Sequence, residues 1–340
     1  MTEISDSRVN TQREVESPPR PPLLARLSIG RFAGLYLLIA LVVTFSLTDP
    51  RFATAANFRV VAASQAIAGI LTLGLVVSLI SGVFDISIAA NMSLAISLVG
   101  FLQSNVHLNP FVAVLLTLCV GLLIGAANAV VITLLHVEPI VATLGMSAIL
   151  GAVTFWLVGG QTILYGISDG FKKFGQATPL SVPIPVFYFL GIALVLWFAL
   201  EHTTWGRYLR AAGQNADATR LAGVKVIRLQ WSALLVSAML ASLAGVVLTM
   251  QLGASSFGSG GPYLLPAFAA AFLGATQVQP GRFNVAGTFI ALYLLAVGVK
   301  GLQLRNPSLP WIADLIQGVT LIVSVALATY ALRKRPSSGT

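Results

Sequence analysis

Charge is what this chain has least of. Only 9% of its 340 residues are charged, whereas 56% are hydrophobic. Soluble domains carry about 25% charged residues, so these few charges could not cover a surface that faces water. The chain also lacks the long alternation of apolar and polar residues that is typical of membrane β-strands. We therefore expect an all-α polytopic membrane protein.

Cysteine and catalytic motifs are scarce as well. The single cysteine, Cys119, cannot form an internal disulfide and has no metal-ligating companions, and we expect a small core residue there. None of the three histidines pairs with a carboxylate at metal or catalytic spacing. The nucleotide-binding motif GxxxxGK[ST] is absent. These absences disfavour an intramembrane enzyme, and we expect no catalytic residue, no metal site and no cofactor on this chain.

Apolar runs about 20 residues long, enough to span a bilayer as helices, fill most of the chain. About ten are expected, and the third and the eighth are the shortest: 31–48, 61–80, 86–102, 111–134, 139–158, 183–200, 229–251, 262–276, 285–302 and 311–332. Together they predict a single transmembrane domain over residues 31–332. Residues 1–30 are polar and proline-rich and are expected to form a disordered cytoplasmic tail, with a second short cytoplasmic tail at 333–340.

The basic residues predict an orientation. If the ten spans alternate from a cytoplasmic N-terminus, fourteen of the 20 lysines and arginines fall on the cytoplasmic side. Cytoplasmic loops of membrane proteins carry such an excess, so the sequence predicts that both termini are inside (N-in/C-in). The net charge of +9 is thereby explained as a topology signal, and no nucleic-acid partner is expected.

The longest polar interruption of the apolar body is Glu201 to Arg228. It carries five basic residues against two acidic ones and has the composition of a helix. A basic, helix-forming loop between two spans on the cytoplasmic side predicts a docking surface for a partner that drives the protein.

Two further segments interrupt the spans. The first, residues 81–87, contains the acid Asp85, whose carboxylate could cap the next helix, contact a solute or contact a cytoplasmic partner. The second, residues 253–262, is rich in glycine and ends in proline. The breaks occupy comparable places in two groups of spans, 61–158 and 229–332, which start on opposite sides of the membrane. We therefore expect two inverted groups of spans with broken or re-entrant segments.

Four segments resemble the permease subunit of bacterial ribose-type sugar ABC importers. They are residues 57–87, which end in SGVFDIS; residues 138–146, EPIVATLGM; residues 204–224, TWGRYLRAAGQNADATRLAGV; and residues 265–274, LPAFAAAFLG. The resemblance covers about residues 50–330. Val83 and Phe84 depart from the family's usual Gly-Ile pair, and Gln317 stands where many members have lysine.

The resemblance implies a set of partners and a site. Such permeases form dimers with a second copy or a sister permease, receive solute from an external solute-binding protein, and lie in the bacterial inner (cytoplasmic) membrane. They are driven by a cytoplasmic ATPase with tandem nucleotide-binding halves, which uses ATP and Mg. Carried over, the family's coupling segment places these residues at the ATPase interface: Gly206, Arg207, Arg210, Gly213, Asn215, Ala218 and Gly223.

A small neutral solute, a sugar or polyol, is expected because the spans hold almost no charge but several uncharged polar groups. Candidates for the solute pathway, each of which could instead bond a neighbouring helix, are Gln65, Thr72, Phe84, Asp85, Ser87, Asn91 and Thr143. Two alternatives stay open: an ion-coupled secondary transporter, for which Asp85 lacks a charged companion, and an ABC permease for an amino acid or another small solute.

Overall fold

The computed structural model describes residues 32–333, so both predicted tails lie outside the described residues except for Arg333. Among the described residues the regular structure is helical, apart from one isolated bridge between Ile163 and Ser255. The elements, in chain order, are α2 (Ala33–Thr48), α3 (Ala55–Ile80), α4 (Ile88–Ser104), α5 (Pro110–Thr133), α6 (Pro139–Val158), α7 (Asp169–Gln176), η1 (Pro179–Ser181), α8 (Ile184–His202), α9 (Thr204–Gln214), α10 (Ala216–Leu221), α11 (Val226–Leu252), η2 (Gly261–Tyr263), α12 (Leu264–Ala275), α13 (Val285–Arg305) and α14 (Ile312–Arg333).

Each of the ten predicted spans coincides with an apolar helix. Several begin at a capping side chain that accepts a first-turn N–H, as Thr54, Asn109, Glu138 and Asn284 do. Six are long and apolar enough to cross a bilayer: α3, α5, α6, α8, α11 and α13. The other four, α2, α4, α12 and α14, have shorter apolar stretches. The prediction of a helical multi-pass membrane protein is confirmed, whereas the count of ten crossings stays a prediction.

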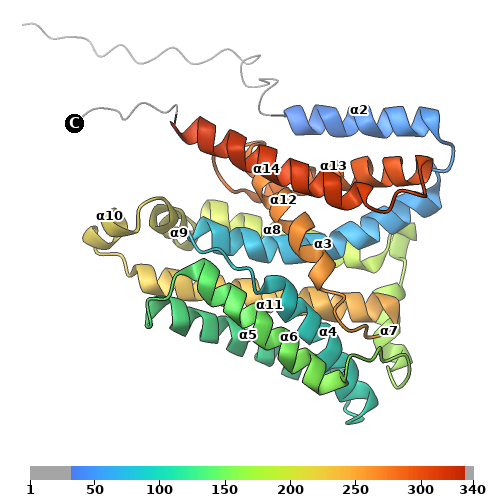
Figure 1. The fold of residues 1–340 in the computed structure, drawn as a ribbon, viewed down its shortest axis with the longest axis horizontal. Helices are drawn as coiled ribbons and strands as arrows, with labels where there is room; N and C mark the ends of the chain where they lie inside the picture. Colours follow the sequence, from blue (N-terminus) through green and yellow to red (C-terminus); the bar gives the residue numbers. More distant parts are fainter. Residues whose placement is uncertain (1–31, 334–340) are drawn as a thin grey trace, which may run out of the picture.

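Helices α3 and α11 form the centre of the molecule. They lie between a layer that contains α13 and α14 and a layer that contains α5 and α6 (Figure 1). Helix α11 packs against α4 and α5, and α3 packs correspondingly against α12 and α13. The short helix α4 also packs against α5 and α6, just as α12 packs against α13 and α14. The two predicted groups of spans therefore exchange their first helices: each first helix packs into the other group.

Small residues permit the closest of these approaches. A Cβ at Gly125 would lie 2.8 Å from the carbonyl oxygen of Leu234, and one at Gly121 would collide with the side chain of Ser242. These two glycines form a GxxxG pair on α5, and the pair lets the backbones of α5 and α11 pack directly together.

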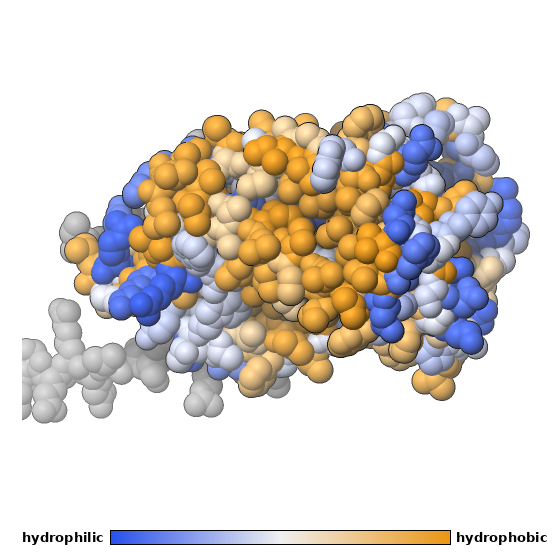
Figure 2. Space-filling model, turned by 90° about the horizontal axis from the view of Figure 1, so that it is seen from below, coloured by the Kyte–Doolittle hydropathy of each residue, from blue (hydrophilic) through white to orange (hydrophobic). Residues whose placement is uncertain are grey.

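The surface has the pattern of a membrane protein. Seen from the side of α5 and α6, an apolar band lies between two hydrophilic ends (Figure 2). Many large apolar side chains of the described chain are exposed, among them Phe111 at 76% and Trp156 at 82%. Cys119 is also exposed on α5, so the expectation that it is a core residue is wrong. Apolar helices in a bilayer point one face outward, and a small apolar residue is equally stable on that face.

The loops gather at two ends, which we name after the short helices there. At the α7 end, Ile163 pairs with Ser255, and Arg51 binds both Asp49 and the carbonyl oxygen of Leu304. The hydrogen bond from Arg51 lowers the pKa of Asp49. At the α10 end lie residues 281–283 and the loop from Glu201 to Arg228, which we call the coupling loop after its predicted role. Segments predicted to share one side of the membrane thus meet at one end of the structure.

We expect Gly125→Leu to separate α5 from α11 and to destabilise the fold by about 1–3 kcal/mol, because the added atoms have no space. Gly145→Leu is the matched control, since a Cβ at Gly145 meets no atom within 4 Å. Thermal unfolding in detergent would measure both variants. Equal shifts in the two midpoints would contradict the close packing at Gly125.

Candidate functional site

The first break enters the molecule from the α10 end and descends beside α11. Gly82, with φ +82°, lies against Gly213 at that end. Three residues later, Asp85 accepts a hydrogen bond of 2.9 Å from the hydroxyl of Ser237. Ser237 is eleven residues after Val226, the first residue of α11, which corresponds to a depth of about 17 Å along the helix axis.

The second break descends from the opposite end beside α4. The Ser255 hydroxyl donates to the carbonyl oxygen of Ile96 at 2.8 Å, and the Gly260 N–H donates to Ser93 at 3.1 Å. Ser93 is eleven residues before Ser104, the last residue of α4, so this break also reaches a depth of about 17 Å. Helix α12, with 12 residues, rises only about 18 Å, and it follows a segment of turns and the short helix η2.

Hydrogen bonds tie the first break to the helices around it. The Asp85 carboxylate accepts from the N–H and the hydroxyl of Ser87, at 3.1 and 2.6 Å, in addition to Ser237. Asn128 of α5 donates to the Ser87 hydroxyl, and Thr143 of α6 donates to the carbonyl oxygen of Phe84 at 3.2 Å. Unpaired polar groups are costly in an apolar medium, so this network fixes the extended segment between three helices.

The predicted pathway residues therefore divide into two sets. Asp85, Ser87, Asn91 and Thr143 are buried and bonded, Asn91 to the carbonyl oxygen of Ala238 and to Ser242. Thr72 is also buried and donates to the carbonyl oxygen of Ala68 in its own helix. Gln65 and Phe84, in contrast, line the two cavities described below. Sequence reasoning missed Ser237, Ser242 and Asn128, because nothing in the pattern of α11 or α5 marks these positions.

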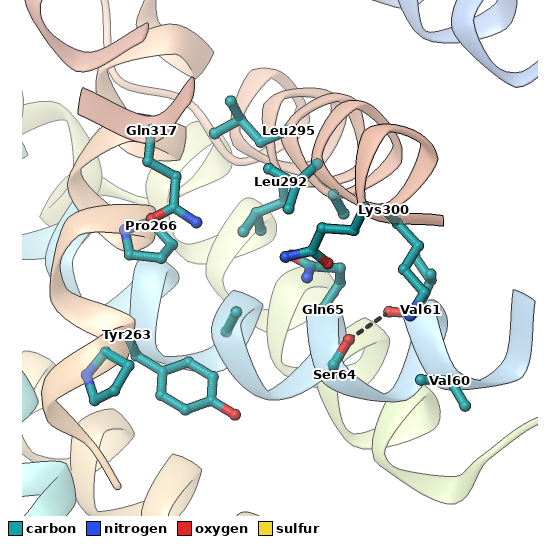
Figure 3. A pocket seen from close by; sticks show the side chains of 15 residues that line it. Val60, Val61, Ser64, Gln65, Tyr263, Pro266, Leu292, Leu295, Lys300 and Gln317 are labelled. Atoms are coloured by element: carbon teal, nitrogen blue, oxygen red, sulfur yellow. Dashed lines mark hydrogen bonds between the residues drawn. The ribbon is translucent and has the colours of Figure 1, made fainter. Parts of the chain in front are cut away.

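A cavity of about 400 Å³ lies between α3, α12, α13 and α14. Gln65 enters it from α3, Tyr263 comes from the start of α12, Lys300 and Gln303 come from α13, and Gln317 comes from α14. Gln317 and Tyr263 lie across the cavity from Gln65 and Lys300 (Figure 3).

The polar side chains of this cavity are uncommitted. Gln65, Tyr263, Lys300, Gln303 and Gln317 are half-buried, and among the described residues none of their side chains has a hydrogen-bond or ion-pair partner. Several donors and acceptors that converge on an otherwise apolar cavity are the usual signature of a binding site for a small polar molecule. Of these five residues, the pathway prediction had included Gln65 alone.

A second cavity, of about 420 Å³, adjoins the first along α12. Pro262 and Gln317 line both cavities, and the second extends to Phe84 of the first break and to Asp314 of α14. The Phe84 ring stacks on Phe272 of α12, with 6.2 Å between the ring centroids. The aromatic side chain of the first break thus lies at the far end of the space that begins with the uncommitted polar groups.

The coupling loop forms two short helices, α9 and α10, as its composition predicted. Thr203 caps α9 by accepting from the N–H of Gly206, and Asn215 caps α10 by accepting from the N–H of Ala218 at 2.9 Å. Gly223 follows α10 with φ +83°, a conformation that glycine adopts without strain.

Three of the predicted coupling residues hold α9 against the membrane body. A Cβ at Gly206 would collide with the end of α8 at Leu200, and one at Gly213 would collide with the carbonyl oxygen of Ile80 at the end of α3. Arg210 forms a two-pronged ion pair with Glu201, with one contact of 3.0 Å. These contacts leave α9 little freedom to move independently of α3 and α8.

The other predicted coupling residues face outward. Arg207, Asn215, Ala218 and Gly223 are exposed at the α10 end. Beside them Leu221, the last residue of α10, is 89% exposed. Leu221 was not among the predicted site residues, although a large apolar residue within a polar loop could have marked it. An exposed apolar side chain among basic residues is typical of a surface that docks a partner.

We expect Gln65→Leu and Gln303→Leu each to lower solute uptake about 2- to 10-fold, because each removes one hydrogen-bonding group of about 0.5–1.5 kcal/mol from the cavity. Thr72→Val on the same α3 is the control, since its hydroxyl bonds only its own helix. ATP-dependent uptake into proteoliposomes with the partner proteins would measure all three. If uptake by Thr72→Val fell as far as uptake by the two cavity variants, the assignment of this cavity as the solute-binding site would be contradicted.

Comparison with known proteins agrees with this geometry. Residues 58–325 match the family model described as branched-chain amino acid transport system/permease component. The ribose import permease RbsC of Escherichia coli K12 is 31% identical over 299 residues, which cover 86% of this chain and 90% of the relative. RbsC of Bacillus subtilis is 30% identical over 301 residues, covering 88% and 92%. The autoinducer 2 import permease LsrD of Photorhabdus temperata is 29% identical over 316 residues, covering 91% and 93%.

The family match spans most of the transmembrane body, including both breaks, the cavity and the coupling loop. The resemblance to ribose-type importers is thus confirmed by relatives that align along nearly their whole length. The chain belongs to this family of transport-system permease components and is the membrane-spanning, non-enzymatic subunit of an ABC importer.

Proposed function

We propose that this permease imports a small neutral polyhydroxylated solute, a sugar or a polyol. The observation that carries the proposal is the cavity with five uncommitted polar side chains, four of which are uncharged. Hydroxyl groups of a solute would pair with the three glutamine amides and with Tyr263. The relatives named for ribose and autoinducer 2 import support the same class of solute.

The geometry favours this class over an amino acid. An amino acid carries both charges, and the first cavity offers Lys300 but no carboxylate, since Asp314 lines only the adjoining cavity. An ion-coupled mechanism would require a titratable or cation-binding group at the midplane that is open to solute. Asp85 is the nearest candidate, but its carboxylate is already bonded by Ser87 and Ser237.

The transport step in this proposal is alternating access between two inverted groups of spans. Helix α11 packs into the first group of spans and α3 packs into the second, and this reciprocal packing supports a pair of related groups that can move against each other. The two breaks support it as well, because they enter from opposite ends to the same depth of about 17 Å. With ten crossings and both termini in the cytoplasm, the α10 end faces the cytoplasm and the α7 end faces the outside.

Family membership implies an ATPase and a solute-binding protein as partners. We further propose that the ATPase has tandem nucleotide-binding halves, uses ATP and Mg, and docks on α9 and α10. The permease would act as a dimer with a second copy or a sister permease, in the inner membrane of a bacterium. Exposed Leu221 and Arg207 would meet the ATPase, while Gly213 would transmit its movement to the first break.

We expect the tagged chain, extracted from native membranes in mild detergent, to retain an ATPase with two nucleotide-binding halves. Leu221→Asp should lower the amount retained about tenfold or more, because it places a charge in an apolar contact. Leu180→Asp is the matched control, since Leu180 is equally exposed at 89% but lies between α7 and α8 at the other end. Uptake of solute by the chain alone in liposomes without ATP would instead establish a secondary transporter.

Orientation can be tested with single cysteines in a Cys119→Ala background. Leu180→Cys and Leu221→Cys place a thiol on equally exposed positions at opposite ends of the molecule. On intact spheroplasts, a membrane-impermeant maleimide should label the cysteine at 180 and should reach the one at 221 only after lysis. The reverse result would overturn the N-in/C-in topology.

A further inference from the structure

A large apolar groove lies between α8 and α11, outside the sites described above. Its volume is about 640 Å³, and its walls are formed almost entirely by apolar side chains of these two helices, with Phe174 of α7 at one end. Val195 on its rim is 68% exposed, so the groove opens to the surface of the apolar body. The groove has no counterpart of the five uncommitted polar side chains, and it is therefore unsuited to a polar solute.

Gly191 keeps this groove open. It lies on the wall formed by α8, and a Cβ there would meet no atom within 4 Å. Glycines at the helix contacts of this protein have no such free space. A Cβ at Gly125 or Gly245, for example, would lie 2.7–2.8 Å from a neighbouring backbone oxygen. Gly191 is thus absent from any helix contact within the described chain, and its lack of a side chain widens a space that the protein leaves unfilled.

The α7 end of the groove carries positive charge. Helix α7 packs on the end of α11, and Lys172 lies over Gly253, the C-cap of α11, where a Cβ would be 3.3 Å from the lysine Cδ. Lys172 forms an ion pair with Asp169, and Lys173 lies near the same carboxylate but forms no ion pair within the described part of the chain. Tyr188 joins α8 to α7 by donating to the carbonyl oxygen of Phe174 at 2.7 Å.

An apolar groove in the membrane-facing surface, with lysines at its end, matches a phospholipid, which has apolar acyl chains and an anionic phosphate. We propose that one acyl chain of a phospholipid binds in the groove between α8 and α11, with its phosphate next to Lys172 and Lys173. The chain would bury apolar surface that is otherwise exposed, and the lysines of α7 complement the phosphate. Since α7 lies at the end opposite to α10, the lipid comes from the leaflet on the α7 side.

The proposed lipid site lies between the two helices that hold the coupling loop. Helices α8 and α11 are the two spans joined by α9 and α10, and α7 braces their other ends. The acyl chain would fill the space between the two helices that hold the coupling segment. The bound lipid would therefore act as part of the support of α9.

Native mass spectrometry of the full chain in nanodiscs that contain dioleoyl phosphatidylglycerol tests the proposal. After release into detergent, the wild type should keep one phosphatidylglycerol per chain, and Gly191→Leu should lower this retention about tenfold by filling the groove. Leu194→Phe is the control, because Leu194 lies on α8, is 64% exposed and does not line the groove. Lys173→Gln should lower the preference for phosphatidylglycerol over phosphatidylcholine about fivefold.

A second measurement covers the case in which Gly191→Leu folds poorly. Phosphatidylglycerol with a photoreactive diazirine on its acyl chain should label Met239 or Met250 of the wild type, both of which line the groove. Equal lipid retention by Gly191→Leu and the wild type, or labelling spread evenly over the apolar band, would overturn the proposal. So would a cross-link from Val195→Cys to a second copy of the chain, because that copy would then cover the groove.

Discussion

The carboxylate of Asp85 is the group on which the interior of this permease depends. An extended segment inside an apolar body exposes backbone groups that no helix satisfies, and each unpaired group costs free energy. Asp85 accepts three hydrogen bonds, two from Ser87 and one from Ser237, and so joins the first break to α11. Thr143 and Asn128 then tie the same segment to α6 and α5. Four elements are held around one buried side chain.

Helix α11 also connects this network to the coupling loop. Its first turns follow α10, its middle binds Asp85 and Asn91, and its far end leads into the second break. The second break in turn lies along α4, which starts directly after the first break. A rearrangement at either break therefore changes the surroundings of the other, although the two enter the molecule from opposite ends.

The sequence predicted the elements better than it predicted the site. Ten apolar runs and their glycine, proline and cap residues mark local structure, and all ten runs coincide with helices. The coupling loop was recognisable because its composition differs from everything around it. The cavity was not, because it combines Gln65 with residues more than 190 positions later, Tyr263 to Gln317, and only the packing brings them together. A polar residue in a span has the same appearance in sequence whether it bonds its own helix, as Thr72 does, or remains uncommitted, as Gln65 does.

The contact between Gly213 and the carbonyl oxygen of Ile80 joins α9 stiffly to the end of α3. Side chains deform easily, so a connection made through several of them loses part of any displacement at each one. Here the backbone of α9 rests directly on the backbone at the end of α3, and the first break begins at the next residue, Ser81. A push on α9 would therefore reach the first break through a single rigid joint. The absence of a side chain at one position makes the connection short, and a short connection has little compliance.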